Sequence, residues 1–180
     1  MDNSEIFNLK YPIGRFKREN HVLSKEERQA LIKIISDFPA QLNSQVAELT
    51  DERLNTPYRP EGWTVKQLVH HLADSHMNSF MRFKLAVTED DPIIKPYQEK
   101  LWAETADVTE VPVQISLMLL EALHLRWVFL LNSLDSDGFN RTFRHPEPGP
   151  MTIAQALSLY AWHCKHHLAH ITRLAERNNW

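Results

Sequence analysis

Apolar side chains recur every three or four residues over four long stretches of the chain, the spacing of one buried face of an α-helix. In the first stretch the apolar positions are 31, 34, 35, 38, 42, 46 and 49. Ser24 precedes them, and Glu27 three residues later completes a capping box. We therefore predict a helix from Ser24 to about Leu49, with a kink at Pro39, which lies inside the pattern.

The second and third stretches predict helices of similar length. Thr64 with Gln67 forms another capping box, and the helix that follows should end before Asp91-Pro92, because a residue before proline disfavours helical backbone. Pro112 suits the first turn of a third helix, whose apolar spacing continues to Leu134.

The fourth stretch begins at Thr152, which forms a capping box with Gln155, and runs to about Arg177. All four glycines lie outside the four stretches, and nine of the ten prolines lie outside them or at a helix start. The pattern predicts an all-α fold, a four-helix bundle with long crossover connections.

The remaining segments predict smaller features. Residues 1–23 show no period and contain early helix breakers, so we expect an extended N-terminal arm. One helical turn is expected at 51–54. Residues 90–110 form a crossover too long for a tight hairpin, and we expect it to cover one end of the bundle as a lid. Within 135–151, residues 141–146 suggest a short strand or hairpin.

Composition narrows the class of protein. A chain of 180 residues is most simply one domain, 1–180, with a core of its own. The net charge of −3 provides no basic surface for nucleic acid. The N-terminus is not a signal peptide, and no run approaches the ~18 apolar residues of a spanning helix, so we expect a cytoplasmic protein without membrane contact. The lone Cys164 excludes an internal disulfide and falls in an apolar stripe, as a small buried residue would.

Histidines carry the candidate chemistry. Four of the ten lie within residues 163–170 and form two pairs four residues apart, His163 with His167 and His166 with His170. Residues four apart share one helix face, so either pair can present two imidazoles to one metal ion. A catalytic metal needs a third ligand, and the second histidine-rich stretch, residues 70–76, is the natural donor. The alternative is that these histidines are exposed or are satisfied at a buried edge.

Helical phase ranks the histidines of the fourth helix. At about 100° per residue, His163 and His167 border the apolar stripe, whereas His166 points towards solvent.

On the second helix the ranking stays open. His76 falls inside the apolar stripe, His71 borders it and His70 lies outside it, as a surface residue would. Phase therefore nominates both His76 and His71. A polar stripe that could line a wet pocket consists of His71, Ser75, Asn78 and Arg82.

Several motifs together resemble one family. They are Gly62-Trp63-Thr64-Val65, His70-His71-Leu72-Ala73-Asp74-Ser75 and His163-x-x-His166-His167-x-x-His170-Ile171, with Pro57-Tyr58-Arg59-Pro60, Asp74-Ser75-His76-Met77-Asn78 and Lys95-Pro96-Tyr97 in support. Over nearly the whole chain, from Tyr11 to Ile171, the sequence resembles the DinB/YfiT-like family of metal-dependent four-helix proteins, and most closely its YfiT-type hydrolases.

The resemblance implies the ligands and the assembly. The histidine before the hydrophobic-Ala-Asp step, His71, and the pair His163 and His167 would hold one divalent metal ion per subunit. Imidazole suits zinc, nickel, copper and iron alike, and of these we expect zinc or nickel. Where many DinB-like proteins have Arg-Gly-Gln after the second histidine pair, this chain has Leu168-Ala169-His170, so no ligand role carries over to His170. The resemblance also implies a homodimer.

Three neutral imidazoles on a divalent ion leave an open position. We expect a metal-dependent hydrolase that uses metal-bound water or hydroxide on a small-molecule substrate. One alternative is a thiol S-transferase that activates a low-molecular-weight thiol, such as bacillithiol, at the same open position. An alternative of another class is a non-catalytic metal-binding module of the stress response, with the histidines stabilising the bundle.

Other side chains are weaker candidates. Asp74 would either orient a ligand imidazole or be a solvated charge that pairs with His70 or Lys66. Trp102, in the expected lid, is the aromatic residue to test for substrate contact. Four residues that could line the pocket, each also compatible with the surface, are Arg82, Arg126, Arg144 and His124.

Overall fold

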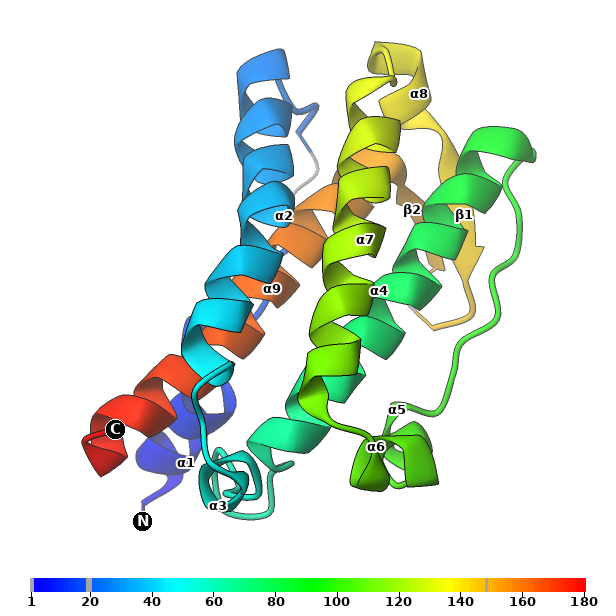
Figure 1. Ribbon diagram of the computed structural model, residues 1–180. Helices are drawn as coiled ribbons and strands as arrows, with labels where there is room; N and C mark the ends of the chain where they lie inside the picture. Colours follow the sequence, from blue (N-terminus) through cyan, green and yellow to red (C-terminus); the bar gives the residue numbers. More distant parts are fainter. Residues whose placement is uncertain (1, 19–20, 148) are drawn as a thin grey trace.

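Four long helices form the body of the protein (Figure 1). The computed structural model describes residues 2–18, 21–147 and 149–180. The long helices are α2 (Lys25–Val46), α4 (Val65–Thr88), α7 (Val113–Asn132) and α9 (Ile153–Asn178). This arrangement confirms the predicted all-α four-helix bundle.

The predicted helix starts are confirmed by the caps. The side chains of Ser24, Thr64 and Thr152 each accept a hydrogen bond from the backbone N–H three residues later, and the reciprocal side chain completes a capping box in all three helices. Pro112 is the residue immediately before α7 rather than its first residue. Pro39 lies inside α2 without ending it.

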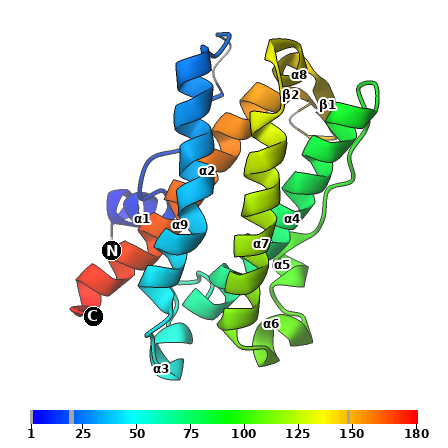
Figure 2. The same ribbon diagram turned by 45° about the horizontal axis from the view of Figure 1, so that its top comes forward.

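The order of the helices explains the long connections. In Figures 1 and 2, α2 and α9 run in one direction, and α4 and α7 run in the other. Helix α2 packs against α9 and α7, and α4 packs against α7, whereas contact between α4 and α9 is the least extensive of the four seams. Because α4 and α7 are parallel neighbours, residues 89–112 must return along the bundle, and they contain the short helices α5 (Glu99–Trp102) and α6 (Ala106–Glu110).

The connection from α7 to α9 contains helix α8 (Ser136–Asn140) and the antiparallel hairpin of β1 (Thr142–His145) and β2 (Gly149–Thr152). The hairpin confirms the short strands expected in this segment. It also holds the start of the crossover, because Arg144 donates its backbone N–H to the carbonyl of Pro92 and accepts one from Ile94.

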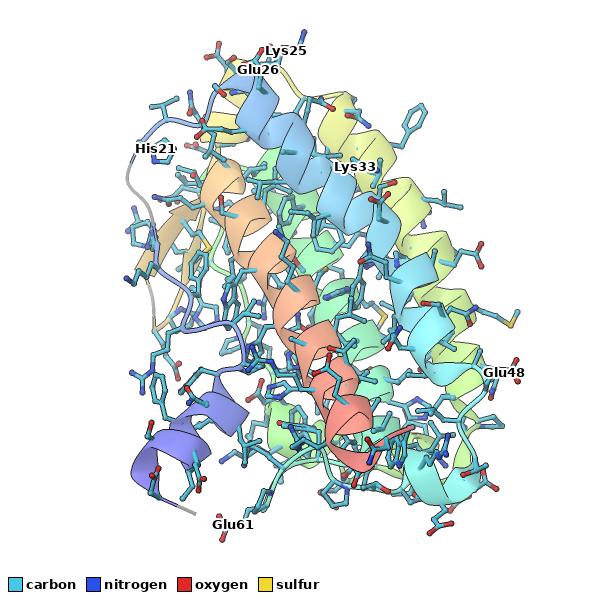
Figure 3. All side chains as sticks on the ribbon, turned by 90° about the vertical axis from the view of Figure 1, so that its left-hand side faces the viewer. His21, Lys25, Glu26, Lys33, Glu48 and Glu61 are labelled. Atoms are coloured by element: carbon cyan, nitrogen blue, oxygen red, sulfur yellow. The ribbon has the colours of Figure 1, made fainter. Side chains whose placement is uncertain are left out.

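The N-terminal arm differs from the expectation. Residues Asn3–Lys10 form helix α1, capped by Asp2 and Glu5, so the prediction of an extended segment is wrong there. The helix lacks an apolar period, and its capping box and contacts at its C-terminal end hold it instead: Tyr11 lies 5.1 Å from Phe7 and 6.4 Å from His166 between ring centroids. Figure 3 shows α1 beside the C-terminal half of α9. The short helix α3 (Asp51–Leu54) is confirmed.

The core lies between the four helices and includes the fully buried Ile35, Leu72, Trp127 and Leu157. Cys164 is buried with them, as expected.

Helix α7 has a second apolar side that faces outward. Its exposed large side chains are Ile115, Met118, Leu119, Leu125 and Phe129. Among the described helices, α7 is the one long and apolar enough to span a membrane by length and composition, so the statement that no stretch approaches such a helix is wrong. Its inner side packs against α2 and α4, as the core helix of a bundle does.

Candidate metal centre

Three histidines converge between α4 and α9, the neighbouring long helices with the least extensive contact. His71 comes from α4, and His163 and His167 come from α9. Their ligand-capable nitrogens all lie within 4.8 Å of one another. The sequence could place His163 beside His167, because both lie on one helix, but only the packing of α4 on α9 brings His71 to them.

The spacing suits a tetrahedral ion. The Nε2 atoms of His163 and His167 lie 3.1 Å apart. Two nitrogens bound to one tetrahedral zinc ion at ~2.05 Å would lie about 3.3 Å apart. His71 has no hydrogen-bond partner for its ring nitrogens among the described residues, so its lone pair is available. The donor set therefore fits a divalent ion, although ligation itself stays a prediction.

Electrostatics keeps all three rings neutral. Burial lowers the pKa of His71 to about 4, and burial together with the neighbouring histidines lowers the pKa of His163 and of His167 well below the usual value. A metal ligand must be a neutral imidazole with a free lone pair. At neutral pH, these three rings meet that condition without losing a proton.

A second cluster of histidines shares one member with the first. The ligand-capable nitrogens of His166, His167 and His170 also lie within 4.8 Å of one another, and the Nε2 atoms of His166 and His170 are 3.2 Å apart. A neutral imidazole has one free lone pair, so His167 cannot be a neutral ligand in both clusters at once. Of these two groups, only the first contains a histidine from another helix.

The prediction that His166 points towards solvent is wrong. Its ring is buried and stacks on Trp162 with centroids 4.4 Å apart, and Tyr11 of the N-terminal arm contacts it from another side. His170 is buried against Tyr58, 4.2 Å away. Helical phase could not show this burial, because segments outside the four long helices provide the cover.

His70 is likewise not a surface residue. It is 5% exposed, its Nδ1 lies 2.8 Å from the hydroxyl of Ser116 on α7, and its Nε2 lies 3.1 Å from the carbonyl of Val111. The close packing of α4 and α7 covers the flank of α4 that the helical wheel placed in solvent.

Helical phase ranked His71 and His76 equally, and the resemblance favoured His71. The hydrogen bonds of His76 now distinguish the two residues. Both ring nitrogens of His76 have partners, Nε2 of His124 at 2.8 Å and Nδ1 of His163 at 3.1 Å. His76 is also fully buried. It therefore lies behind His163 rather than in the ligand cluster. His124 lies behind His76 in the core and borders a groove between α2 and α7, not the cavity beside His163.

A cavity of about 630 Å³ opens beside His163. Its lining includes Ser75, Arg82, Tyr97 and Tyr160, and residues 96–101 of the crossover form one side. The crossover thus covers the cavity, and Ser75 and Arg82 belong to the polar stripe that the sequence predicted. The pattern missed Tyr160, because its position in the apolar stripe of α9 concealed the hydroxyl at its tip.

The remaining candidates lie elsewhere. Arg126 lies over the ring of Phe80, and Arg144 pairs with Asp91. Trp102 packs on Tyr97 and lines an adjoining cavity of about 510 Å³ that also reaches Arg82.

Asp74 is half-buried, and burial together with Asp107 raises its pKa to about 6. In the part of the chain that the structure describes, its carboxylate hydrogen-bonds neither a candidate ligand nor His70, and the ammonium of Lys66 donates to the carbonyl of Thr109 instead. Neither of the two roles considered for Asp74 is therefore seen.

Burial of neutral imidazoles predicts that the metal-free protein loses stability in mild acid. For His71, His124 and His166 the folded pKa is about 4, below the unfolded value of 6.5, so the unfolded chain binds more protons between these values. The free energy of unfolding should be constant above about pH 7 and fall from about pH 6.5 to about pH 4. Asp74, whose pKa is raised, opposes this trend between about pH 6 and 3.8. It is one group against three histidines, so the free energy of unfolding should still fall.

The measurement is urea unfolding in the presence of a chelator at several pH values across this range. A free energy of unfolding that stays constant from neutral pH to about pH 4.5 would contradict the prediction.

Comparison with known proteins places these features in one family. Residues 35–171 match the DinB superfamily. A protein of Bacillus cereus strain 03BB102, named "Putative metal-dependent hydrolase", is 51% identical over 172 residues, covering 96% of this chain and 98% of its own. A protein of Oceanobacillus iheyensis with the same descriptive name is 50% identical over 173 residues, covering 96% of this chain and 99% of its own.

A solved structure agrees with the fold. YfiT from Bacillus subtilis, described as "a probable metal-dependent hydrolase with an unusual four-helix bundle topology", superposes with a TM-score of 0.93 at 49% identity, covering 96% of this chain and 99% of that one. The helix order, the histidine clusters and these similarities lead to one conclusion: the chain is a member of the DinB superfamily.

Proposed function

We propose that the protein is a metal-dependent hydrolase of a small molecule, with His71, His163 and His167 as ligands of one divalent ion, zinc or nickel. The observation that carries the proposal is the convergence of three neutral imidazoles from two helices beside an open cavity. The cluster has three members among the described residues, and three protein ligands with an open position are typical of a catalytic zinc site. A bound divalent ion would supply Lewis acidity, which polarises a substrate carbonyl and lowers the pKa of water.

The side chains of the cavity would bind and orient the substrate. The guanidinium of Arg82 lies 3.5 Å from the hydroxyl of Tyr160, and both line the cavity beside His163. Burial raises the pKa of the Tyr97 phenol, which therefore stays protonated and can donate a hydrogen bond to a substrate oxygen. Residues 96–101 would shield the reacting groups from bulk water.

Thiol S-transfer is the second candidate function, and Arg82 favours it. A low-molecular-weight thiol such as bacillithiol carries carboxylates, and a guanidinium binds a carboxylate through two parallel hydrogen bonds. Arg82 in the cavity would hold such a carboxylate, and an ion held by the three histidines would supply the positive charge that stabilises a thiolate. A non-catalytic metal-binding module is the third candidate, and it would be favoured by a fourth protein ligand on the ion.

We also propose that a second copy of the chain covers the outward side of α7. The exposed side chains at positions 115, 118, 119, 125 and 129 form a stripe along one face of the helix. Beside it, a groove of about 580 Å³ between α2 and α7, lined in part by Pro39, Met118 and Leu125, could receive side chains of the partner.

Single substitutions should show which histidine cluster binds metal. We expect His71→Ala and His163→Ala each to weaken Zn²⁺ binding by more than the about 10- to 100-fold that loss of an outer-shell partner costs, because each removes a ligand. His166→Ala and His170→Ala, which affect only the second cluster, are the matched controls and should bind Zn²⁺ as the wild type does. The measurement is competition with a chromophoric chelator. The reverse ranking would assign the ion to the second cluster.

Activity should depend on the same ligands. We expect metal-loaded protein to hydrolyse at least one member of a library of activated esters and amides, and His71→Ala to lose at least about 100-fold of that rate. Conjugation of monochlorobimane to bacillithiol, glutathione or cysteine by the loaded protein, without hydrolysis of the library, would establish thiol transfer instead. If neither reaction occurs although Zn²⁺ binds, the non-catalytic role stands.

The dimer has its own test. Sedimentation equilibrium should give twice the chain mass for the wild type and the single mass for Leu125→Glu/Phe129→Glu, because charged groups would then be buried at the contact. Ile93→Glu, at an equally exposed apolar residue outside α7, should remain dimeric. A monomeric wild type would refute the proposal.

A further inference from the structure

A line of hydrogen bonds leads from helix α2 to the candidate metal centre. The carbonyl oxygen of Ile35 lies 2.6 Å from Nδ1 of His124, and Nε2 of His124 lies 2.8 Å from Nδ1 of His76. Nε2 of His76 lies 3.1 Å from Nδ1 of His163. The four residues come from α2, α7, α4 and α9, so the line crosses all four long helices. We call Ile35, His124, His76 and His163 the histidine relay.

The relay starts at a carbonyl that helix α2 cannot satisfy in the usual way. In an α-helix the carbonyl of residue 35 accepts a hydrogen bond from the N–H of residue 39. Residue 39 is proline, which has no N–H. Ile35 is fully buried, so its carbonyl needs a donor from another helix, and Nδ1 of His124 is in place.

The carbonyl sets the direction of every later hydrogen bond. A carbonyl only accepts, so His124 must carry its proton on Nδ1, and its Nε2 is an acceptor. His76 must then donate from Nδ1 and accept at Nε2, and His163 must donate from Nδ1. This holds for neutral rings, and burial lowers the pKa of all three. His163 is left with a bare Nε2, the atom that lies 3.1 Å from Nε2 of His167.

We propose that His124 and His76 are positioning residues which, starting from the carbonyl that Pro39 leaves free, fix the Nδ1–H tautomer of His163 and so present its Nε2 lone pair to the metal ion. The inference rests on the proposed metal centre for its purpose, but the tautomer exists without metal. Ligand histidines usually donate their second N–H to a carboxylate, a carbonyl or water. Here the carbonyl acts through two further imidazoles.

The competing explanation is packing alone. His76 and His124 contact Phe38 and Trp127 in the core, and rings of any tautomer would fill the same volume. Packing requires the shape of the rings, whereas the relay requires a particular nitrogen of each ring to carry the proton. The two explanations therefore differ in a property that can be measured directly.

The first experiment reads the tautomers in the metal-free wild type. Long-range ¹H–¹⁵N correlation spectra of protein labelled at its histidine nitrogens, in the presence of a chelator, distinguish Nδ1–H from Nε2–H for each ring. We expect Nδ1–H for His124, His76 and His163, assigned by single substitution of each. Nε2–H at any one of the three would overturn the proposal, since it breaks the direction of the relay.

The second experiment tests whether position 76 needs a side chain that forms hydrogen bonds or only one that fills the same volume. In His76→Gln the carboxamide can accept from Nδ1–H of His163 and donate to Nε2 of His124, whereas His76→Leu can do neither. We expect His76→Leu to weaken Zn²⁺ binding by about 10- to 100-fold and His76→Gln to restore most of that loss. Equal losses in both variants would indicate packing and overturn the proposal.

The control is His70→Leu, another buried histidine of α4 with two hydrogen-bond partners, neither of which belongs to the relay. It should leave Zn²⁺ affinity and the tautomer of His163 unchanged; a loss as large as that of His76→Leu would overturn the proposal. Failure of the metal centre looks different: the wild type would show the expected tautomers but would not bind Zn²⁺.

Discussion

Imidazoles that are buried as neutral rings, without an ion pair to any described residue, are the constraint on which this structure depends. Eight of the histidines, at positions 70, 71, 76, 124, 163, 166, 167 and 170, are buried or half-buried in the bundle, and burial lowers the pKa of each. A buried neutral ring still has one donor and one acceptor, and leaving either unsatisfied costs free energy. Some rings meet this demand by hydrogen bonds across helices, and the pairs His163–His167 and His166–His170 place their Nε2 atoms 3.1 and 3.2 Å apart. Nδ1 of His166 and Nδ1 of His167 are buried without a hydrogen-bond partner among the described residues.

The order of the helices decides where these rings can meet. Since α4 and α7 are parallel neighbours, the chain needs the long crossover of residues 89–112, and that crossover covers the cavity beside His163. Contact between α4 and α9 is the least extensive of the four contacts between long helices, and the cavity lies there, lined by Ser75 and Arg82 of α4 and by Tyr160 and His163 of α9. The same topology that lengthens the connections therefore places a cavity beside the candidate ligands, as the proposed open coordination position would require.

A proline inside a helix usually costs stability, because it removes a backbone hydrogen bond. In α2 the carbonyl of Ile35, which Pro39 leaves without its usual donor, accepts a hydrogen bond from Nδ1 of His124 and is the fixed end of the histidine relay. From the sequence, a kink is predicted at Pro39 and His124 is a candidate pocket residue, with no reason to connect the two. The contact between α2 and α7 connects them. It brings Nδ1 of His124 to 2.6 Å from the carbonyl oxygen of Ile35, although the two residues are 89 positions apart in the sequence.

The sequence by itself determined the four helices, their capping boxes, the hairpin and the set of histidines, because these depend on spacing and local hydrogen bonds along one segment. It was wrong where cover comes from elsewhere in the chain: α7 buries His70, the arm with α1 buries His166, and α1 itself forms without an apolar period. Helical phase left His71 and His76 equal, because a helical wheel describes one helix at a time, and among the signals in the sequence only the family resemblance favoured His71. Only the packing of four helices decided that His71 faces the pair on α9 while His76 lies behind His163, since both outcomes satisfy the same pattern in sequence.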